Sequence, residues 1–146
     1  MKMHFEPLTQ TNWAMLPESA KPRFCDDSRG IMVFDEHNKL IAGAVMDSWT
    51  DNSCMIHVFI GNPFVLKHRF AHEVFNYAFN IAKRGVIIGC TPANNKKALK
   101  FNANMGFEEQ TRIKDGYAEG VDHVITQLRK ENCKFIDQQE KIRRVA

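Results

Sequence analysis

The stretch that decides the fold is NNKKALKFNANMGF, residues 94–107, which follows the apolar run GVIIGC at residues 85–90. A short continuous apolar run is typical of an inner strand of a sheet. Asn95 can cap a helix, because its side-chain oxygen accepts a hydrogen bond from a free backbone N–H of the first turn. Gly106 can end that helix, since glycine reaches positive φ without strain. The stretch therefore predicts a strand, a short helix and a buried aromatic, Phe107, at the start of the next strand.

The remaining strands give a mixed α/β order around this unit. Strands are expected at residues 3–9, 31–34, 40–46 and 53–60, with a final pair at 107–116 and 121–131. The connection from residue 54 to residue 90 runs strand, helix, strand, so we expect these two strands to be parallel.

Two further helices are predicted, one short and one long. Thr11 or Asn12 can cap a short helix after the first strand, and Pro17 limits its length. Apolar residues recur at helical spacing over residues 66–83, which predicts one long helix packed against a sheet. The polar tail at 137–146 is left open between a loose segment and a docked helix.

Composition favours one intracellular domain. The 146 residues suit a single domain, and the net charge of +3 is too small to indicate nucleic-acid binding. The four cysteines, Cys25, Cys54, Cys90 and Cys133, show no C-x-x-C pair and no zinc-site spacing, so we expect reduced thiols and no metal. No signal-peptide core and no apolar run near the roughly 20 residues of a membrane span are seen. We therefore expect a cytoplasmic protein.

The motif in residues 94–107 resembles one that follows the fifth strand in the GNAT N-acetyltransferase superfamily. The matching positions are Asn95, Ala98, Phe101, Asn102, Gly106 and Phe107. The resemblance extends from Met3 to Cys133 and is closest to a bacteriophage-type branch. It implies one domain over residues 1–146 with a mixed, mostly antiparallel sheet of about six to seven strands. That sheet would be splayed at the fourth and fifth strands and flanked by helices.

The resemblance also implies acetyl-CoA as cosubstrate. Its pantetheine arm would hydrogen-bond to the fourth strand and pass the helix that Asn95 caps, while its pyrophosphate would lie at the start of the long helix. The residues assigned to these contacts are Val58, Phe59, Ile60, Val65, Leu66, Lys67, His68, Arg69, Phe70, Asn95, Ala98 and Phe101. The phosphate loop of the family carries glycines, whereas VLKHRF at residues 65–70 has none and offers positive charge instead.

The general base is not given by the motif, because Cys90 stands where some relatives have a glutamate. His57 is our first candidate, since the ordinary pKa of an imidazole, roughly 6.5, suits proton transfer near neutral pH. The alternative is that His57 faces the other side of the sheet as a core histidine. Asp47 and Asp122 are weaker candidates for the base, each with the alternative of a structural carboxylate at the end of a strand.

The acid that protonates the leaving thiolate is also open. Many relatives have a tyrosine at the position of Asn102, which can donate a hydrogen bond to the sulfur and cannot act as an acid. Tyr117 is a candidate late proton donor, or else a loop aromatic. Trp49 is a candidate wall of the acceptor pocket, or a rim aromatic. A route through a cysteine nucleophile is disfavoured.

The resulting hypothesis is transfer of an acetyl group from acetyl-CoA to a primary amine by direct attack. The acceptor is a small-molecule or protein amine that the sequence does not identify, and a homodimer is compatible with the family. A GNAT-fold module that binds coenzyme A or a protein without catalysis is the main alternative. A basic accessory factor is a third reading.

Overall fold

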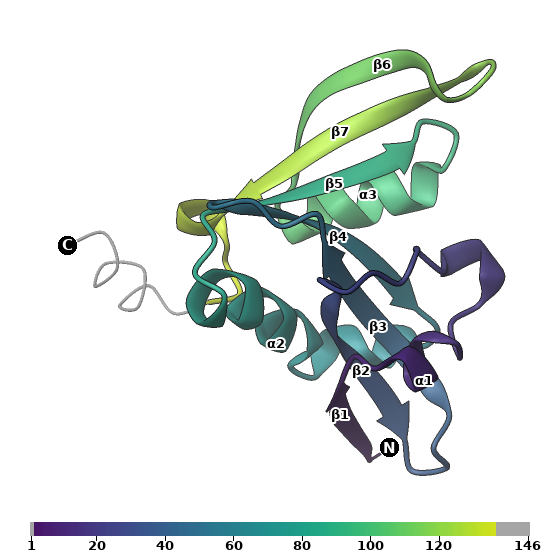
Figure 1. The fold of residues 1–146 in the computed structure, drawn as a ribbon, viewed down its shortest axis with the longest axis vertical. Coiled ribbons are helices and arrows are strands. Elements are labelled where there is room, and N and C mark those ends of the chain that lie inside the picture. The colour runs from purple at the N-terminus through teal and green to yellow at the C-terminus, as the bar shows by residue number, and fades with distance from the viewer. Residues whose placement is uncertain (1, 137–146) are drawn as a thin grey trace.

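The computed structural model describes residues 2–136, and the tail at 137–146 lies outside the described residues. The strands form one seven-stranded sheet in the order β1-β2-β3-β4-β5-β7-β6 (Figure 1). They are β1 (Met3–Pro7), β2 (Arg29–Asp35), β3 (Leu40–Asp47), β4 (Ser53–Ile60), β5 (Val86–Pro92), β6 (Glu108–Ala118) and β7 (Val121–Arg129). All neighbouring pairs are antiparallel except β4 and β5, so the predicted mixed sheet is confirmed.

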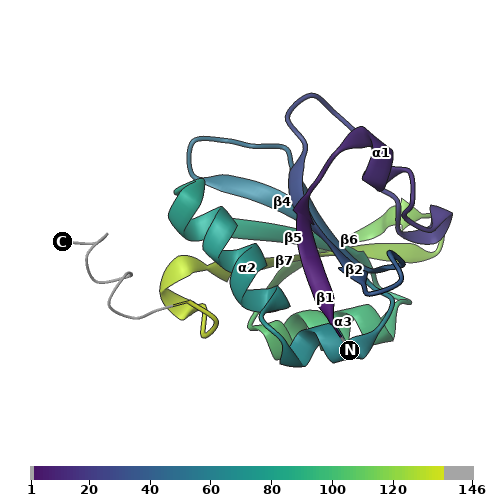
Figure 2. The same ribbon diagram turned by 90° about the horizontal axis from the view of Figure 1, so that it is seen from below.

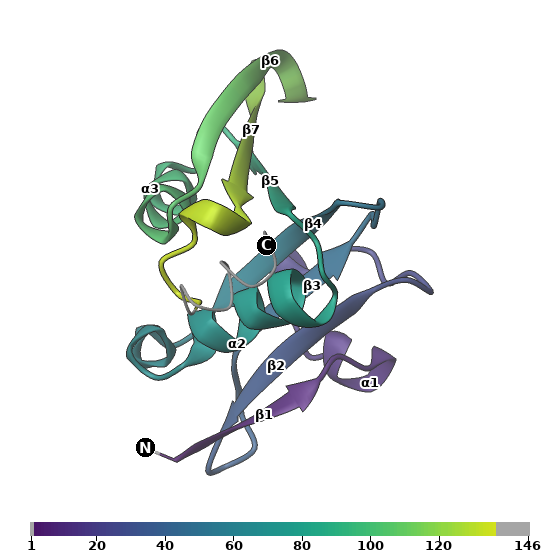
Figure 3. The same ribbon diagram turned by 90° about the vertical axis from the view of Figure 1, so that its left-hand side faces the viewer.

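The parallel pair β4–β5 is short. Its register joins Ser53 to Val86, Cys54 to Ile87 and Met55 to Ile88, and no further pair follows. β4 nevertheless stays paired with β3 as far as Ile60, and β5 stays paired with β7 as far as Pro92. The two halves of the sheet therefore diverge beyond Met55, as the ribbon shows from the side (Figure 3). This is the predicted splay at the fourth and fifth strands.

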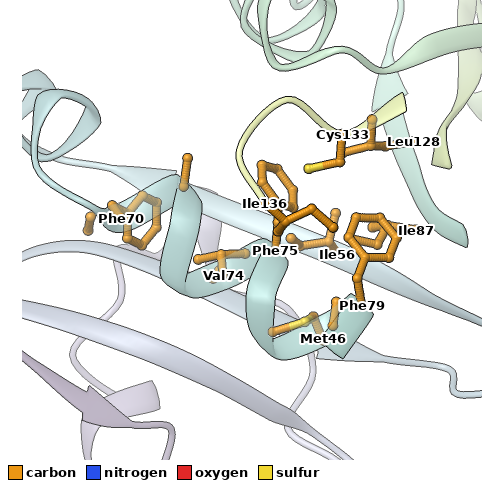
Figure 4. Close-up of a cluster of buried hydrophobic side chains, with 14 of the residues drawn as sticks. Met46, Ile56, Phe70, Val74, Phe75, Phe79, Ile87, Leu128, Cys133 and Ile136 are labelled. Atoms are coloured by element: carbon orange, nitrogen blue, oxygen red, sulfur yellow. The ribbon is translucent and has the colours of Figure 1, made fainter. Parts of the chain in front are cut away.

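The helix α2 (Phe70–Asn76) covers one face of the sheet and continues into a π-helical turn, Tyr77–Ile81. Its apolar side chains pack against side chains from the strands and from the segment after β7 (Figure 4). The buried residues labelled there are Met46, Ile56, Phe70, Val74, Phe75, Phe79, Ile87, Leu128, Cys133 and Ile136. This core stabilises the end of the sheet where β4 and β5 are still paired, because the helical segment packs against residues of β3, β4, β5 and β7.

The prediction of one helix from residue 66 to residue 83 is wrong at both ends. Asn62 accepts a hydrogen bond from the N–H of Phe64, and this cap starts a separate 3₁₀ turn, Pro63–Lys67. Arg69 then takes a left-handed conformation, with φ 66°, and α2 begins only after it. Lys83 is also left-handed, with φ 59°, so the helical segment stops before it. Apolar periodicity continued through these breaks because it reports burial and not backbone continuity.

The opposite face of the sheet carries α1 (Gln10–Trp13) and a second, smaller core of Leu16, Met32, Phe34 and Val45. Figure 2 shows α1 and α2 on opposite sides of the sheet. The predicted caps of α1, Thr11 and Asn12, are wrong: Thr9 is the N-cap. The Thr9 side chain accepts from the N–H of Asn12, and the Asn12 side chain accepts from the N–H of Thr9. Asn12 thus takes part in the cap from inside the helix.

The helix α3 (Lys96–Met105) matches its prediction at both ends. Oδ1 of Asn95 accepts a hydrogen bond from the backbone N–H of Ala98 at 3.1 Å. Gly106 is left-handed, with φ 103°, and ends the helix. The ring of Phe107 then lies 6.3 Å from that of Phe75 on α2, so it links the two helices across the apolar core.

The cap at Asn95 gives a stability prediction. Asn95→Ala is expected to lower the free energy of unfolding by about 1 kcal/mol, because it leaves a first-turn N–H without its side-chain acceptor. Asn94→Ala is the matched control, since Asn94 is exposed and its side chain makes no hydrogen bond within residues 2–136. Urea denaturation of the two variants measures the difference. Equal stability of the two variants would contradict a capping role.

Candidate active site

The divergence of β4 and β5 opens a cavity of about 510 Å³, which we call the main cavity. Its strand walls are Ile56, His57 and Val58 from β4 and Gly89, Cys90, Thr91 and Pro92 from β5. The remaining walls are Ser19, Ala20, Lys21, Pro22, Leu66, Phe70, Ala71, Val74, Phe75, Asn95, Ala98, Phe101, Asn102, Met105, Phe107 and Tyr117. A volume of this order suits a small-molecule site. The β4 edge beyond Met55 pairs with no strand within residues 2–136, so its backbone groups border this space.

His57 lies on the face of the sheet opposite α2. Ile56, its neighbour, belongs to the core under α2, and successive residues of a strand point to opposite faces. The His57 side chain is 36% exposed and lines the main cavity. The histidine is therefore placed in the cavity wall and is not a fully enclosed core residue.

The carboxylate of Asp47 is hydrogen-bonded to the imidazole of His57. The register pairs Val45 with His57 and Asp47 with Met55, so Asp47 and His57 are diagonal neighbours on adjacent strands. Nε2 of His57 lies 3.0 Å from Oδ2 of Asp47. An ionised carboxylate only accepts hydrogen bonds, so Nε2 carries the proton and donates it. In the neutral imidazole this leaves Nδ1 as an acceptor, and no hydrogen bond reaches Nδ1 within the described residues.

Asn102 points from α3 into the wall formed by β5. Its amide nitrogen donates a hydrogen bond to Oγ1 of Thr91 at 3.0 Å, and Thr91 is buried. Thr91 was missed by the sequence reasoning, although it lies next to Cys90 at the end of the apolar strand. This hydrogen bond joins α3 to β5 beside the main cavity. Asn102 also lines the cavity itself.

The expected cofactor residues divide into two groups. Val58, Leu66, Phe70, Asn95, Ala98 and Phe101 line the main cavity, as does Tyr117, whose side chain is exposed. Phe59, Ile60, Val65, Lys67, His68 and Arg69 do not line it. Val65 is fully buried in the core, and the side chains of Phe59 and Ile60 pack against the two cores, so these three offer only backbone groups.

The basic loop before α2 is exposed. His68 lies against the ring of Phe64, with ring centroids 4.0 Å apart, and Arg69 forms an ion pair with Glu73 at 3.0 Å. Lys67 forms no ion pair within residues 2–136. The loop therefore supplies positive charge at the α2 end of the main cavity, which Leu66 and Phe70 line.

Asp122, a weaker candidate for the base, and Trp49, a candidate pocket wall, both form hydrogen bonds that hold neighbouring loops in place. Oδ1 of Asp122 accepts a hydrogen bond from the N–H of Asp115 at 3.1 Å, which shapes the β6–β7 hairpin. The indole N–H of Trp49 donates to the carbonyl of Asp27 at 2.8 Å, and Arg84 lies over its ring. Trp49 is not among the residues that line the main cavity.

The cysteines near the site are poor nucleophiles. Burial raises the pKa of the Cys90 thiol, and burial raises the pKa of Cys54 to about 12. A thiol with a raised pKa is protonated at neutral pH, and the thiolate is the reactive form.

Among residues 2–136, no group of three or more His, Cys, Asp and Glu side chains is placed to hold a metal ion. No helix in that range is long and apolar enough to cross a membrane.

No family model matches this sequence, and no curated protein matches it. Solved structures do match. The spermidine/spermine N-acetyltransferase SpeG from Vibrio cholerae, in complex with manganese ions, has a TM-score of 0.69 at 13% identity, covering 88% of this chain and 93% of that chain. A chimera of the Vibrio cholerae enzyme with hSSAT has a TM-score of 0.71 at 14% identity, covering 94% and 100%. A dodecameric structure of the Vibrio cholerae enzyme has a TM-score of 0.67 at 12% identity, covering 88% and 94%.

At 12% to 14% identity these likenesses show the fold. The seven-stranded mixed sheet, its short parallel β4–β5 pair and the flanking helices form the GNAT fold, as the sequence predicted.

Burial, together with the raised pKa values of Cys54 and Cys90, predicts the order of cysteine reactivity. In the folded protein at neutral pH, exposed Cys25 is expected to react with iodoacetamide well before Cys54, Cys90 and Cys133. Peptide mass spectrometry after timed alkylation measures the rates, and alkylation of the unfolded chain is the control in which all four react alike. Alkylation of Cys90 as fast as Cys25 in the folded protein would contradict the assignment of a protonated thiol.

Proposed function

We propose that this protein is an acetyl-CoA-dependent N-acetyltransferase that acts on a primary amine by direct attack. The observation that carries the proposal is the hydrogen-bonded His57–Asp47 pair in the wall of the cavity between the splayed strands. The structural neighbours named above are N-acetyltransferases, which supports the same reaction class.

The chemistry of the cavity walls supports acetyl-CoA as the ligand. The unpaired edge of β4 from Ile56 to Ile60 offers backbone donors and acceptors to the amides of the pantetheine arm. Leu66, Phe70 and Phe101 offer apolar contacts to its alkyl segments. We assign the pyrophosphate to the free N–H groups at the start of α2, with Lys67, His68 and Arg69 supplying charge in place of glycines.

The chemistry assigned to this chain's residues is the movement of two protons. Acetyl-CoA supplies a thioester whose carbonyl carbon is the electrophile and whose sulfur leaves. The amine must lose a proton, and Nδ1 of His57 is the proposed acceptor, with Asp47 holding the imidazole in the required tautomer. A bond forms between the amine nitrogen and the acetyl carbon, the carbon–sulfur bond breaks, and the sulfur gains a proton. Tyr117 is the proposed donor, and Asn102 the proposed hydrogen-bond donor to sulfur.

A binding module without catalysis is the second candidate. The sequence features that favour it are the glycine-free loop at residues 65–70, the asparagine at position 102 and the cysteine at position 90. This candidate shares acetyl-CoA binding with the enzyme and lacks turnover, so binding and turnover must be measured separately.

The role of His57 gives the first kinetic prediction. His57→Ala is expected to bind acetyl-CoA with unchanged affinity by calorimetry while its kcat falls by about 100-fold or more, because the proton acceptor is lost. His37→Ala is the matched control, since His37 is an exposed histidine in the β2–β3 turn and does not line the main cavity. Wild-type protein that binds acetyl-CoA and acetylates no amine in a broad acceptor panel would exclude the enzyme and favour the binding module.

We assign Asp47 a positioning role. Asp47→Asn is expected to lower kcat by about tenfold or more, because the amide can hold the imidazole in the wrong tautomer, while KM for acetyl-CoA is unchanged. Asp47→Glu is expected to recover part of the rate, since it restores an acceptor-only group. Asp51→Asn, at an exposed position in the β3–β4 turn, is the control. A loss in Asp47→Asn that appears only in KM would contradict the positioning role.

A further inference from the structure

A second cavity, of about 470 Å³, borders the main cavity at His57. We call it the acceptor cavity for the role argued below. Its walls are Pro22, Arg23, Cys25, Asp27, Asp47, Ser48, Met55 and His57. Pro22 and His57 line both cavities, so the imidazole stands at their boundary. A group that occupies the second cavity therefore reaches the same histidine as a group in the main cavity.

The acceptor cavity is lined by positively and negatively charged side chains that do not form ion pairs with one another. Asp47 is 9% exposed and hydrogen-bonded to His57. Asp27 and Arg23 are exposed, and neither forms an ion pair within residues 2–136. Their charged atoms are thus farther apart than ion-pair distance although both line one cavity. The cavity offers one guanidinium and one carboxylate that have no partner within those residues, beside the proton-accepting histidine.

This arrangement complements a molecule with two opposite charges. An ammonium group is attracted by Asp27 and Asp47, and His57 is placed to take its proton. A carboxylate matches Arg23, because a planar guanidinium binds a carboxylate through two parallel hydrogen bonds. A polyamine with positive charges alone would place one of them near Arg23. Lys21 in the main cavity does not change this, because its ammonium is paired with Glu18 at 3.0 Å.

We propose that the acceptor binds in this second cavity and is a small amine that also carries a carboxylate, of the amino-acid type. The proposal rests on the N-acetyltransferase function proposed above and names its substrate class. The bound ammonium first releases one proton to solvent. The neutral amine then bonds to the acetyl carbon and loses a second proton to His57, the thioester carbon–sulfur bond breaks, and Tyr117 protonates the thiolate. This acceptor would carry a negative as well as a positive charge. It would differ in this from spermidine, the substrate after which the structural neighbours are named.

The test is a panel of amino acids, each with its carboxamide, together with spermidine. For at least one amino acid, kcat/KM with the wild-type protein is expected to exceed that of its carboxamide and of spermidine by about tenfold or more. Arg23→Gln is expected to abolish that preference by lowering kcat/KM for the acid alone. Asp27→Asn is expected to lower kcat/KM for acid and carboxamide alike. Lys39→Gln, an exposed change in the β2–β3 turn, is the control.

The outcomes separate the two proposals. Turnover of spermidine or of the carboxamides at rates equal to or above those of the acids would overturn this substrate class and leave the N-acetyltransferase function standing. An acid preference that Arg23→Gln does not change would overturn the assignment of the acceptor cavity. Absence of turnover with every amine, despite acetyl-CoA binding, would overturn the proposed function and this inference with it.

Discussion

β4 and β5 hydrogen-bond as parallel strands over three residue pairs and then separate, while each keeps its other neighbour. The separation leaves an unpaired strand edge at residues 56–60 and a cavity between the two halves of the sheet. Backbone groups on an unpaired edge need partners, so such an edge favours a ligand with amide groups. The closed end is held by α2 and the π-helical turn that follows it. Phe75 of α2 and Phe79 of the turn pack over Ile56 and Ile87 (Figure 4). The rest of the candidate site depends on this divergence.

The residues around the opening come from distant parts of the chain and are placed by different interactions. His57 and Asp47 meet because the β3–β4 register makes them diagonal neighbours. Asn102 is placed by its hydrogen bond to Thr91, which ties α3 to β5. Arg23 and Asp27 arrive on the irregular segment between α1 and β2. A rigid sheet thus carries the pair proposed to accept the proton, and a connecting segment carries the charges proposed to select the acceptor.

The sequence predicted those elements whose bounds are determined by residues at or next to their ends. The α3 helix was predicted at both ends, because Asn95 and Gly106 act within one turn of their own positions. The helix at 66–83 was mispredicted, because the Asn62 cap and the left-handed Arg69 interrupt a pattern that reports only burial. Thr9 was missed as a cap because the reciprocal bonds with Asn12 depend on backbone geometry.

The sequence names candidate site residues, and the structure adds how those residues lie relative to one another. His57 and Asp47 were both candidates, yet their pairing requires the strand register, which the sequence does not state. Thr91 was missed because its role depends on the approach of α3. Val65 was assigned to a ligand and lies in the core, since the 3₁₀ turn rotates it inward. The second cavity depends on how the 22–27 segment lies against β3 and β4, which no motif encodes.

The most direct test of the account is amide hydrogen exchange of residues 56–60 by NMR, with and without acetyl-CoA. Acetyl-CoA is expected to slow exchange at alternate amides of this segment, because successive N–H groups of a strand point to opposite edges and only one edge is unpaired. The paired residues Cys54 and Met55 should change little. Binding of acetyl-CoA without added protection at residues 56–60 would contradict the claim that the splayed edge of β4 holds it.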